Sequence, residues 1–210
     1  NQALKNVIAL KKSPAMAYIV SEIRAMTEVN LLENKFEMGK EDEAWEGLSC
    51  FEEEIASPDY EFMRDRWGTR MKDLKGIMLL KRGDLDGAEE TLRQGLEIAN
   101  KRQYKKYIGR AERLSGQILA GRGAYDPAEA KLREALSKLE EVGNPKQLWI
   151  THTALARLYE KMNRPDLERE QWQTAAAVVN FTADDLEDEE LRTTFINAKP
   201  VQEILENARL

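Results

Sequence analysis

The chain contains one cysteine, Cys50, and one histidine, His152, among its 210 residues. A single cysteine excludes an internal disulfide framework and any metal site built from several cysteines. A single histidine leaves almost no room for histidine-based catalysis or a zinc site. Cys50 lies between Leu48 and Phe51 and is interpreted as a small packed hydrophobic residue, and His152 as an ordinary structural or surface histidine. The scarcity of cysteine suits a reducing compartment and predicts a cytoplasmic location.

Long apolar runs are also missing. No run reaches the roughly 18 residues that a membrane span needs, so we expect no membrane association. The residues after Asn1 lack the apolar core of a secretory signal, and we expect the chain to be a processed product or an excised piece of a longer protein. Hydrophobic residues still make up 42% of the sequence and charged residues 33%, with a formal net charge of −6. This composition favours one or two folded domains over a disordered chain.

Catalytic and cofactor motifs are absent from the sequence. There is no Gly-x-x-x-x-Gly-Lys phosphate loop, no His-Glu-x-x-His zinc motif and no Gly-x-Ser-x-Gly nucleophile turn. Residues 121–123 (Gly-Arg-Gly) are too short for a dinucleotide fingerprint and follow an expected helix rather than a strand. The sequence therefore predicts a protein that is not an enzyme and holds no cofactor or metal.

What the sequence does contain is an internal repeat of forty residues. Residues 69–108 align with residues 109–148 without gaps, and thirteen of the forty positions are identical. Ordinary composition would give roughly two or three identities. A third, weaker copy spans residues 149–188. The recurring positions include a small residue (Gly76, Gly116, Ala156) and a turn residue (Gly83, Gly123, Asn163).

Each copy predicts two antiparallel helices joined by a short turn. The apolar residues of 70–82 and of 85–99 recur at spacings of three and four, which indicates amphipathic helices. Gly83 follows a basic last turn and is suited to a left-handed helix cap. Pro127 and Pro165 are expected to open the second helices. No segment alternates with a period of two, so we expect no strands.

These features resemble the tetratricopeptide repeat family. The matching residues are a small residue followed three positions later by a large one, then a Gly-to-Ala segment into the second helix (Gly76 and Leu79, Gly116 and Leu119, Ala156 and Tyr159; residues 83–88 and 123–128). The third copy departs from the pattern at Pro165 and Glu168. The period of forty is longer than the usual 34 and is similar to the C-terminal arms of large bacterial signal-transduction ATPases and cyclase-type proteins. The resemblance implies an all-α fold, a right-handed superhelix (α-solenoid) of antiparallel helix pairs with about eleven helices.

We expect the whole chain, residues 1–210, to form a single solenoid. Its expected parts are irregular N-terminal helices, three repeats and C-terminal capping helices (residues 1–66; 69–108, 109–148 and 149–181; 182–210). The first part is expected to hold a fragment of a helix over 1–11, a long helix over 15–38 and its partner over 44–55. In the last part Thr182 is expected to cap a helix of about 186–197, and another helix is expected from Pro200.

The resemblance also implies that the first helix of each pair lines a concave groove. The residues carried over to that groove are Arg70, Asp73, Ile77, Lys81, Arg110, Arg113, Gln117, Thr153, Arg157 and Lys161. Six of them are cations and one is an anion, so the expected groove is basic although the chain is acidic. A basic groove favours acidic peptide segments or carboxylate-bearing ligands.

The function expected from these features is a non-catalytic protein–protein interaction or scaffold module. It would be the sensing or partner-binding arm of a larger cytoplasmic signalling protein. The alternative is a ligand-sensing domain that binds a small anionic molecule in the groove. The sequence pI of about 5.2 argues against nucleic acid, and self-association stays open. The clustered charges also fit solvated helix faces and ion pairs between adjacent repeats.

Overall fold

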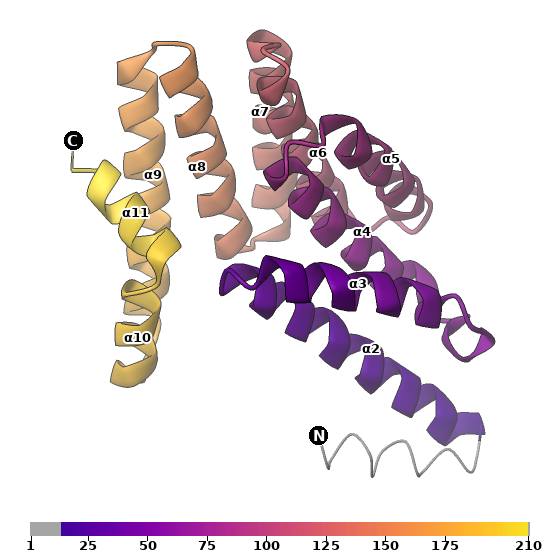
Figure 1. Cartoon of the computed structure of the whole chain (residues 1–210). Helices are drawn as coiled ribbons and strands as arrows, with labels where there is room; N and C mark the ends of the chain where they lie inside the picture. Colours follow the sequence, from indigo (N-terminus) through magenta and orange to yellow (C-terminus); the bar gives the residue numbers. More distant parts are fainter. Residues whose placement is uncertain (1–13, 210) are drawn as a thin grey trace. The chain divides into compact units, whose positions relative to one another are not determined.

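The computed structural model describes residues 14–209, shown with the labels used here in Figure 1. This part of the chain contains ten α-helices and no strand, which confirms the all-α class. The helices pack tightly in consecutive pairs, as the repeat predicts. The helix expected over residues 1–11 lies outside the described residues. The elements are α2 (Pro14–Glu37), α3 (Glu41–Ile55), the short 3-10 helix η1 (Pro58–Tyr60), α4 (Arg64–Lys81), α5 (Leu85–Lys101), α6 (Lys105–Gly121), α7 (Tyr125–Val142), α8 (Pro145–Lys161), α9 (Pro165–Asp184), α10 (Glu189–Ile196) and α11 (Lys199–Asn207).

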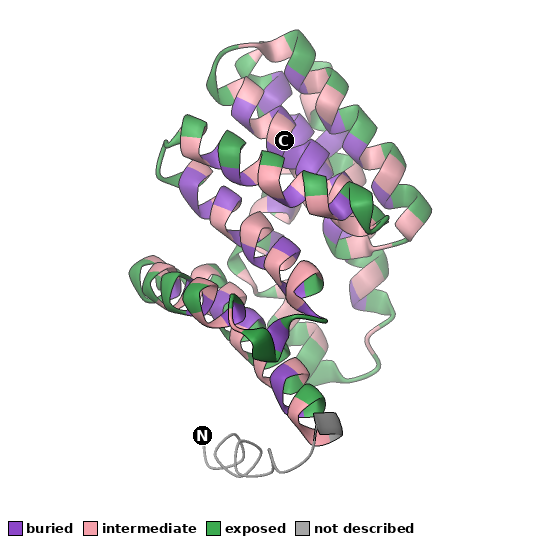
Figure 2. Ribbon diagram, turned by 90° about the vertical axis from the view of Figure 1, so that its right-hand side faces the viewer, coloured by how far each residue is buried: buried purple, intermediate pink, exposed green. Residues whose placement is uncertain are grey.

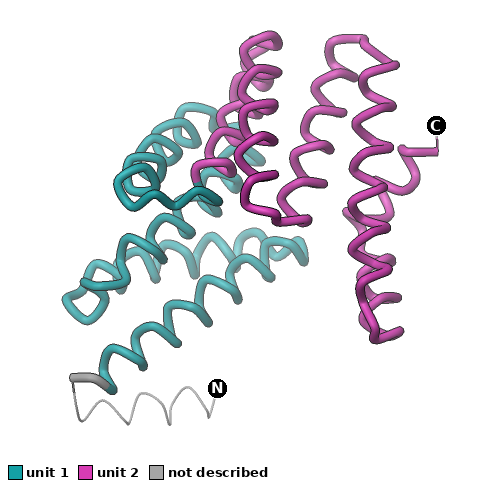
Figure 3. The backbone as a smooth tube through the Cα atoms, turned by 180° about the vertical axis from the view of Figure 1, so that it is seen from behind, with its two compact units in different colours: residues 1–107 teal, residues 108–210 magenta. Residues whose placement is uncertain are grey.

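The chain divides into two compact units, residues 1–107 and residues 108–210, coloured separately in Figure 3. The boundary falls within α6. Unit 1 contains the hairpins α2–α3 and α4–α5. Unit 2 contains most of α6, then α7, the hairpin α8–α9, and the two short helices α10 and α11, of which α11 packs on α9.

The core of unit 1 forms where the apolar faces of its helices meet. On α3 the buried residues recur at spacings of three and four (Ala44, Leu48, Phe51, Ile55). They pack in one cluster with buried side chains of α2 and α4, among them Val29, Trp67 and Met71. Figure 2 shows these faces as purple bands along the inner sides of the helices. Burial of these faces, rather than helix propensity alone, holds the hairpins together.

Cys50 is not part of that core. It is exposed, so the interpretation of Cys50 as a packed residue is wrong. The reason is its position on α3: Cys50 is two positions after Leu48, so its side chain leaves the helix about 200° around from that of Leu48.

Unit 2 has two core clusters, one between α7 and α8–α9 and one where α9 meets α11. The small residue Gly116 allows α6 and α7 to approach closely. A Cβ at this glycine would lie 2.7 Å from Leu132 Cγ and 3.0 Å from the carbonyl oxygen of Ala128. Both distances are shorter than ordinary Cβ contacts, so a side chain at position 116 would require α7 to shift.

The turns within three hairpins occur at the repeat position that the sequence predicted for them. Gly83 and Gly123 have φ of +80° and +77°, and Asn163 occupies the same column with φ of +54°. Asparagine is one of the few residues other than glycine that adopt this left-handed conformation readily. The predicted left-handed cap at Gly83 is therefore confirmed.

Three predicted helix boundaries differ from the structure. α4 begins at Arg64, several residues before the predicted start at 70, and Pro127 is the third residue of α7 rather than the first. Thr182 does not cap a helix, because α9 continues to Asp184 and the Thr182 hydroxyl donates to the carbonyl of Val178 at 2.8 Å. The cap of α10 is Asp188, whose side chain accepts from the N–H of Leu191 at 2.9 Å.

An arginine ties the two hairpins of unit 1 together. Arg64, the first residue of α4, donates from Nε to the carbonyl of Ile55 at 3.0 Å and from Nη2 to the carbonyls of Ala56 and Ser57 at 2.8 and 3.0 Å. A cation at the C-terminal end of α3 also complements the dipole of that helix. The guanidinium therefore fixes the end of α3 against the start of α4.

Candidate functional site

The predicted groove residue Arg70 joins α4 to α2. Its Nε donates to Glu33 Oε1 at 2.9 Å, its Nη2 donates to Asn30 Oδ1 at 2.6 Å, and a second bond from Nη2 reaches Glu33 Oε2. Burial disfavours the charge of Arg70, but the hydrogen bonds and charge of Glu33 outweigh this and raise the pKa of Arg70. Arg70 is therefore a structural contact between the first helices of successive pairs.

The second predicted cation of unit 1, Lys81, is exposed at the end of α4. Its ammonium lies 2.5 Å from Glu41 Oε1 and 5.2 Å from the ring centroid of Phe36. The ion pair is open to water, with about half of the Lys81 side chain exposed. Such pairs contribute about 0–1 kcal/mol, so a ligand carboxylate can replace Glu41 at little cost. Asp73 and Ile77, the other two predicted residues on α4, are half-buried.

In unit 2 the predicted groove residue Arg113 is buried. Only 4% of it is exposed. Its Nη1 donates to Gln147 Oε1 at 2.8 Å and lies 3.4 Å from Thr151 Oγ1, both on α8. Arg113 thus cross-links α6 and α8, in the way that Arg70 links α4 to α2.

Three more predicted residues of unit 2 are half-buried: Arg110, Gln117 and Thr153. The Thr153 hydroxyl donates to the carbonyl of Trp149 at 2.9 Å, one helical turn earlier. This hydroxyl is therefore engaged by its own helix.

The remaining two predicted residues, Arg157 and Lys161, are exposed on α8. The Arg157 guanidinium lies 2.5 Å from Glu203 Oε1 of α11, with both side chains about half exposed. Lys161 forms no ion pair with any residue in the described part of the chain. These two cations, with Lys81 in unit 1, are the members of the predicted set most available to a ligand.

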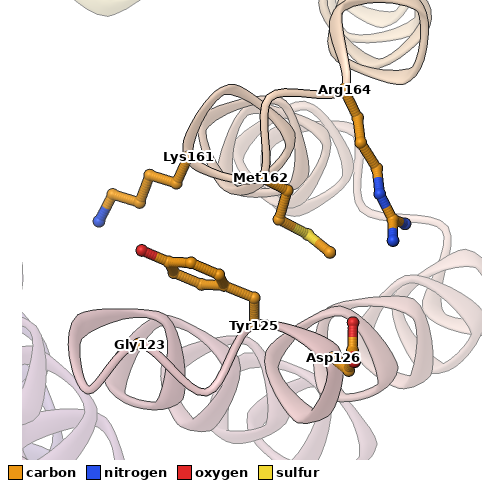
Figure 4. Close-up of a pocket in the computed structure, with 6 residues that line it drawn as sticks. All are labelled: Gly123, Tyr125, Asp126, Lys161, Met162 and Arg164. Atoms are coloured by element: carbon orange, nitrogen blue, oxygen red, sulfur yellow. The ribbon is translucent and has the colours of Figure 1, made fainter.

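Lys161 also borders a pocket of about 350 Å³ between the turns of two hairpins (Figure 4). The pocket is lined by Gly123, Tyr125, Asp126, Lys161, Met162 and Arg164. Figure 4 shows the Lys161 and Tyr125 side chains extending toward one end of the pocket and Arg164 lying at the other end near Asp126. The sequence analysis placed only Lys161 at a site. Lys161 Nζ and the Tyr125 hydroxyl can both donate to an anion.

The sequence did not predict a polar network in unit 2 that is centred on the buried Tyr159 and extends to exposed arginines. The buried Tyr159 hydroxyl donates to Glu129 Oε1 at 2.8 Å and accepts from Arg133 Nη2 at 2.7 Å. Arg164 Nη1 lies 3.3 Å from Glu129 Oε2. Burial opposes ionisation of Glu129, but the hydrogen bonds from Tyr159 and Arg133 outweigh it and lower the pKa of Glu129. Burial and the bond to Glu129 raise the pKa of Tyr159.

One sequence signal bears on that network. Glu129 and Arg133 occupy two identical columns of the repeat, opposite Glu89 and Arg93. In the first copy, however, Arg93 bonds to Glu90 at 2.7 and 2.9 Å on the solvent side of α5. The same residues therefore make different contacts in the two copies.

The structure offers no cluster suited to metal chemistry in its described residues. No group of three or more His, Cys, Asp or Glu side chains within 14–209 is arranged to hold a metal ion. His152 is half-buried, and its Nδ1 lies 2.8 Å from Gln171 Oε1, a contact between the two helices of one hairpin. Between Pro14 and Arg209, no helix combines the length and apolarity needed to cross a membrane.

The arrangement in each unit is thus a set of cations on the first helices, some built into contacts with neighbouring helices and some exposed. Arg70 and Arg113 belong to the first group, and Lys81, Arg157 and Lys161 to the second. Exposed cations of this kind can bind carboxylates or other anions. No family model matches this sequence, and no curated protein matches it either.

Proposed function

We propose that this chain is a tetratricopeptide-like, right-handed α-solenoid that acts as a non-catalytic protein-binding module. In this proposal it is the partner-binding arm of a larger signalling protein. The observation that supports it is the succession of tightly packed helical pairs in register with the forty-residue repeat. Within each unit, stacked pairs present their first helices as a surface on which a partner segment can lie.

The partner in this proposal is an acidic peptide segment. Lys81, Arg157 and Lys161 are exposed on first helices and bear either a water-screened ion pair or none within residues 14–209. Their carboxylate contacts are exchangeable because exposed pairs are weak. Within unit 1 Arg70 links the first helices α2 and α4, and within unit 2 Arg113 links the first helices α6 and α8.

Charge reversal at the three exposed cations tests this function. The variant Lys81→Glu, Arg157→Glu, Lys161→Glu is titrated into short fluorescein-labelled peptides rich in Asp and Glu, and fluorescence anisotropy is measured. We expect the affinity to fall at least about tenfold, since attraction becomes repulsion. The matched control is Arg93→Glu with Arg169→Glu, because these arginines are about as exposed but lie on the second helices α5 and α9. Equal losses in the two variants would reject the first-helix surface.

The pocket between the hairpin turns of unit 2 supports the alternative, a sensor for a small anion. It places Lys161 and Tyr125 at one end and has a volume of about 350 Å³, within the range of small-molecule sites. Calorimetric titration with inorganic phosphate and with succinate tests it. Binding to the wild type that disappears in Lys161→Gln but not in Lys81→Gln would favour the sensor over the peptide module.

A further inference from the structure

Besides the pocket of unit 2, the structure has a cavity in unit 1, on a different face of α4 from the predicted groove residues. Its volume is about 280 Å³, and residues of α3, α4 and α5 line it. Ile55, Met71 and Ile98 give it an apolar wall, one from each helix. Gly68 and Lys72 of α4 also line it, and they lie on one side of the helix because they are four residues apart. Arg70, two residues from each, projects from the opposite side.

Gly68 keeps this cavity open. Glycine within a helix is unfavourable, so it usually has a packing reason. At Gly109 and Gly116 the reason is visible, because an added Cβ would lie 2.7 Å from a leucine of α7. At Gly68 an added Cβ would meet nothing within 4 Å. Helix packing does not require this glycine, and what its missing side chain provides is the open space of the cavity.

The acidic groups at the rim are already paired. Glu52 Oε2 lies 2.6 Å from Lys75 Nζ, and Asp65 Oδ2 lies 2.6 Å from Arg102 Nε. The rim cation Arg64 is bound to the carbonyls at the end of α3. Among the charged residues that line the cavity, Lys72 is therefore the one without an ion pair or a backbone carbonyl partner in the part of the chain that the structure describes.

Lys72 supplies a half-buried ammonium whose hydrogen-bond partner is neutral. Its Nζ donates to Gln94 Oε1 at 2.7 Å, and it forms no ion pair with any residue from 14 to 209. Burial lowers the pKa of Lys72. Its stem is held against α5, where a Cβ at Gly95 would lie 3.3 Å from Lys72 Cβ. Glu52 and Glu90 attract this ammonium but form no ion pair with it, and an anion in direct contact would offset more of the cost of its partial burial.

We propose that this cavity binds a small monocarboxylate that carries one apolar chain or ring. The apolar part lies against Ile55, Met71 and Ile98, and the carboxylate accepts hydrogen bonds from Lys72 Nζ. The volume is just below the usual range for small-molecule pockets, which limits the apolar part to about the size of a leucine or phenylalanine side chain. The site does not depend on the proposed peptide surface, because it uses the other side of α4.

The experiment is a calorimetric titration of the whole chain with phenylacetate and with 4-methylpentanoate. Acetate, which lacks the apolar part, and phenylacetamide, which lacks the charge, are the control ligands. We expect both test ligands to bind at least about tenfold more tightly than either control, because each control removes one of the two contacts. Failure of phenylacetate and 4-methylpentanoate to bind overturns the proposal.

Three variants locate the binding. Gly68→Leu fills the cavity with a good helix former, and Lys72→Gln removes the ammonium; each should weaken phenylacetate binding at least about tenfold, with thermal melting showing that the fold is kept. Lys161→Gln, in the other unit, should leave binding unchanged. If Gly68→Leu binds phenylacetate as well as the wild type does, the ligand lies elsewhere. If Lys72→Gln does so, the ligand carboxylate is not bound by Lys72.

Discussion

Replacing two glycines by alanine, Gly68→Ala on α4 and Gly116→Ala on α6, should change the stability of the protein in opposite directions. Both glycines lie within helices, where alanine is favoured over glycine by about 0.8–1.0 kcal/mol. At Gly68 the new methyl group enters open space, so the full gain of about 1 kcal/mol is expected.

At Gly116 the same gain is opposed by a collision. The new methyl carbon would lie 2.7 Å from Leu132 Cγ and 3.0 Å from the backbone oxygen of Ala128, and the backbone of α7 cannot rotate away as a side chain can. Overpacking of this kind costs about 1–3 kcal/mol, so the net effect ranges from about zero to a loss of about 2 kcal/mol. The two variants should differ by about 1–3 kcal/mol.

Urea unfolding followed by circular dichroism measures this difference, and thermal melting provides a second readout at about 2–4 °C per kcal/mol for a chain of this length. Gly95→Ala is an informative intermediate, because its methyl group would lie 3.3 Å from Lys72 Cβ. If Gly116→Ala is as stabilising as Gly68→Ala, the close approach of α6 to α7 is wrong.

Four further predictions concern other parts of the fold. Tyr159→Phe should cost about 1–2 kcal/mol in urea unfolding, because it leaves Glu129 without its buried donor. The pKa of Glu129 in the folded protein lies below its ordinary value, so the ionised carboxylate stabilises the fold above about pH 4.5. This contribution is lost as the pH falls through the folded pKa. In Glu129→Gln the free energy of unfolding should therefore depend less on pH in the acid range. Asp188→Ala should lower the free energy of unfolding by about 1 kcal/mol, because α10 loses its N-cap. Thr182→Ala should lower it by less than half of that. Equal losses would indicate that Thr182 acts as a cap after all. Cys50 should react with a thiol reagent in the native protein as fast as in urea, and strong native protection would contradict its exposure.

The helical pairing and the turns could be predicted from the sequence because they depend on local properties. Residue size at a fixed interval decides where helices can approach, and left-handed turns accept few residue types, so Gly83, Gly123 and Asn163 marked their positions. The start of α4 was missed because residues 64–68 are mostly charged and end in Gly68, which interrupts the apolar spacing. The end of α9 was missed because Thr182 has both the residue type and the acidic followers of a cap, although its hydroxyl bonds backward along the helix instead.

The site was less predictable, because the state of a charged side chain depends on residues far away in the sequence. The aligned repeat predicted Arg70 and Arg113 as groove residues, but it did not indicate that Glu33 would bind Arg70 or that Gln147 would bind Arg113. The cavity beside Lys72 is bounded by three helices, and Gly68 has no counterpart of its own kind in the next copy, where Ile108 stands. The feature of the sequence that pointed to this cavity was Gly68, a glycine within a helix that no packing pattern required.

The contacts between α2 and α4 have a consequence in salt solution. Glu22 pairs with Arg66 and Glu33 with Arg70, so two ion pairs reinforce the apolar contact between these two first helices. Electrolyte screens partly exposed charges and strengthens rather than weakens apolar contacts. Rising salt should therefore weaken the ionic part of the α2–α4 contact and leave its apolar part in place.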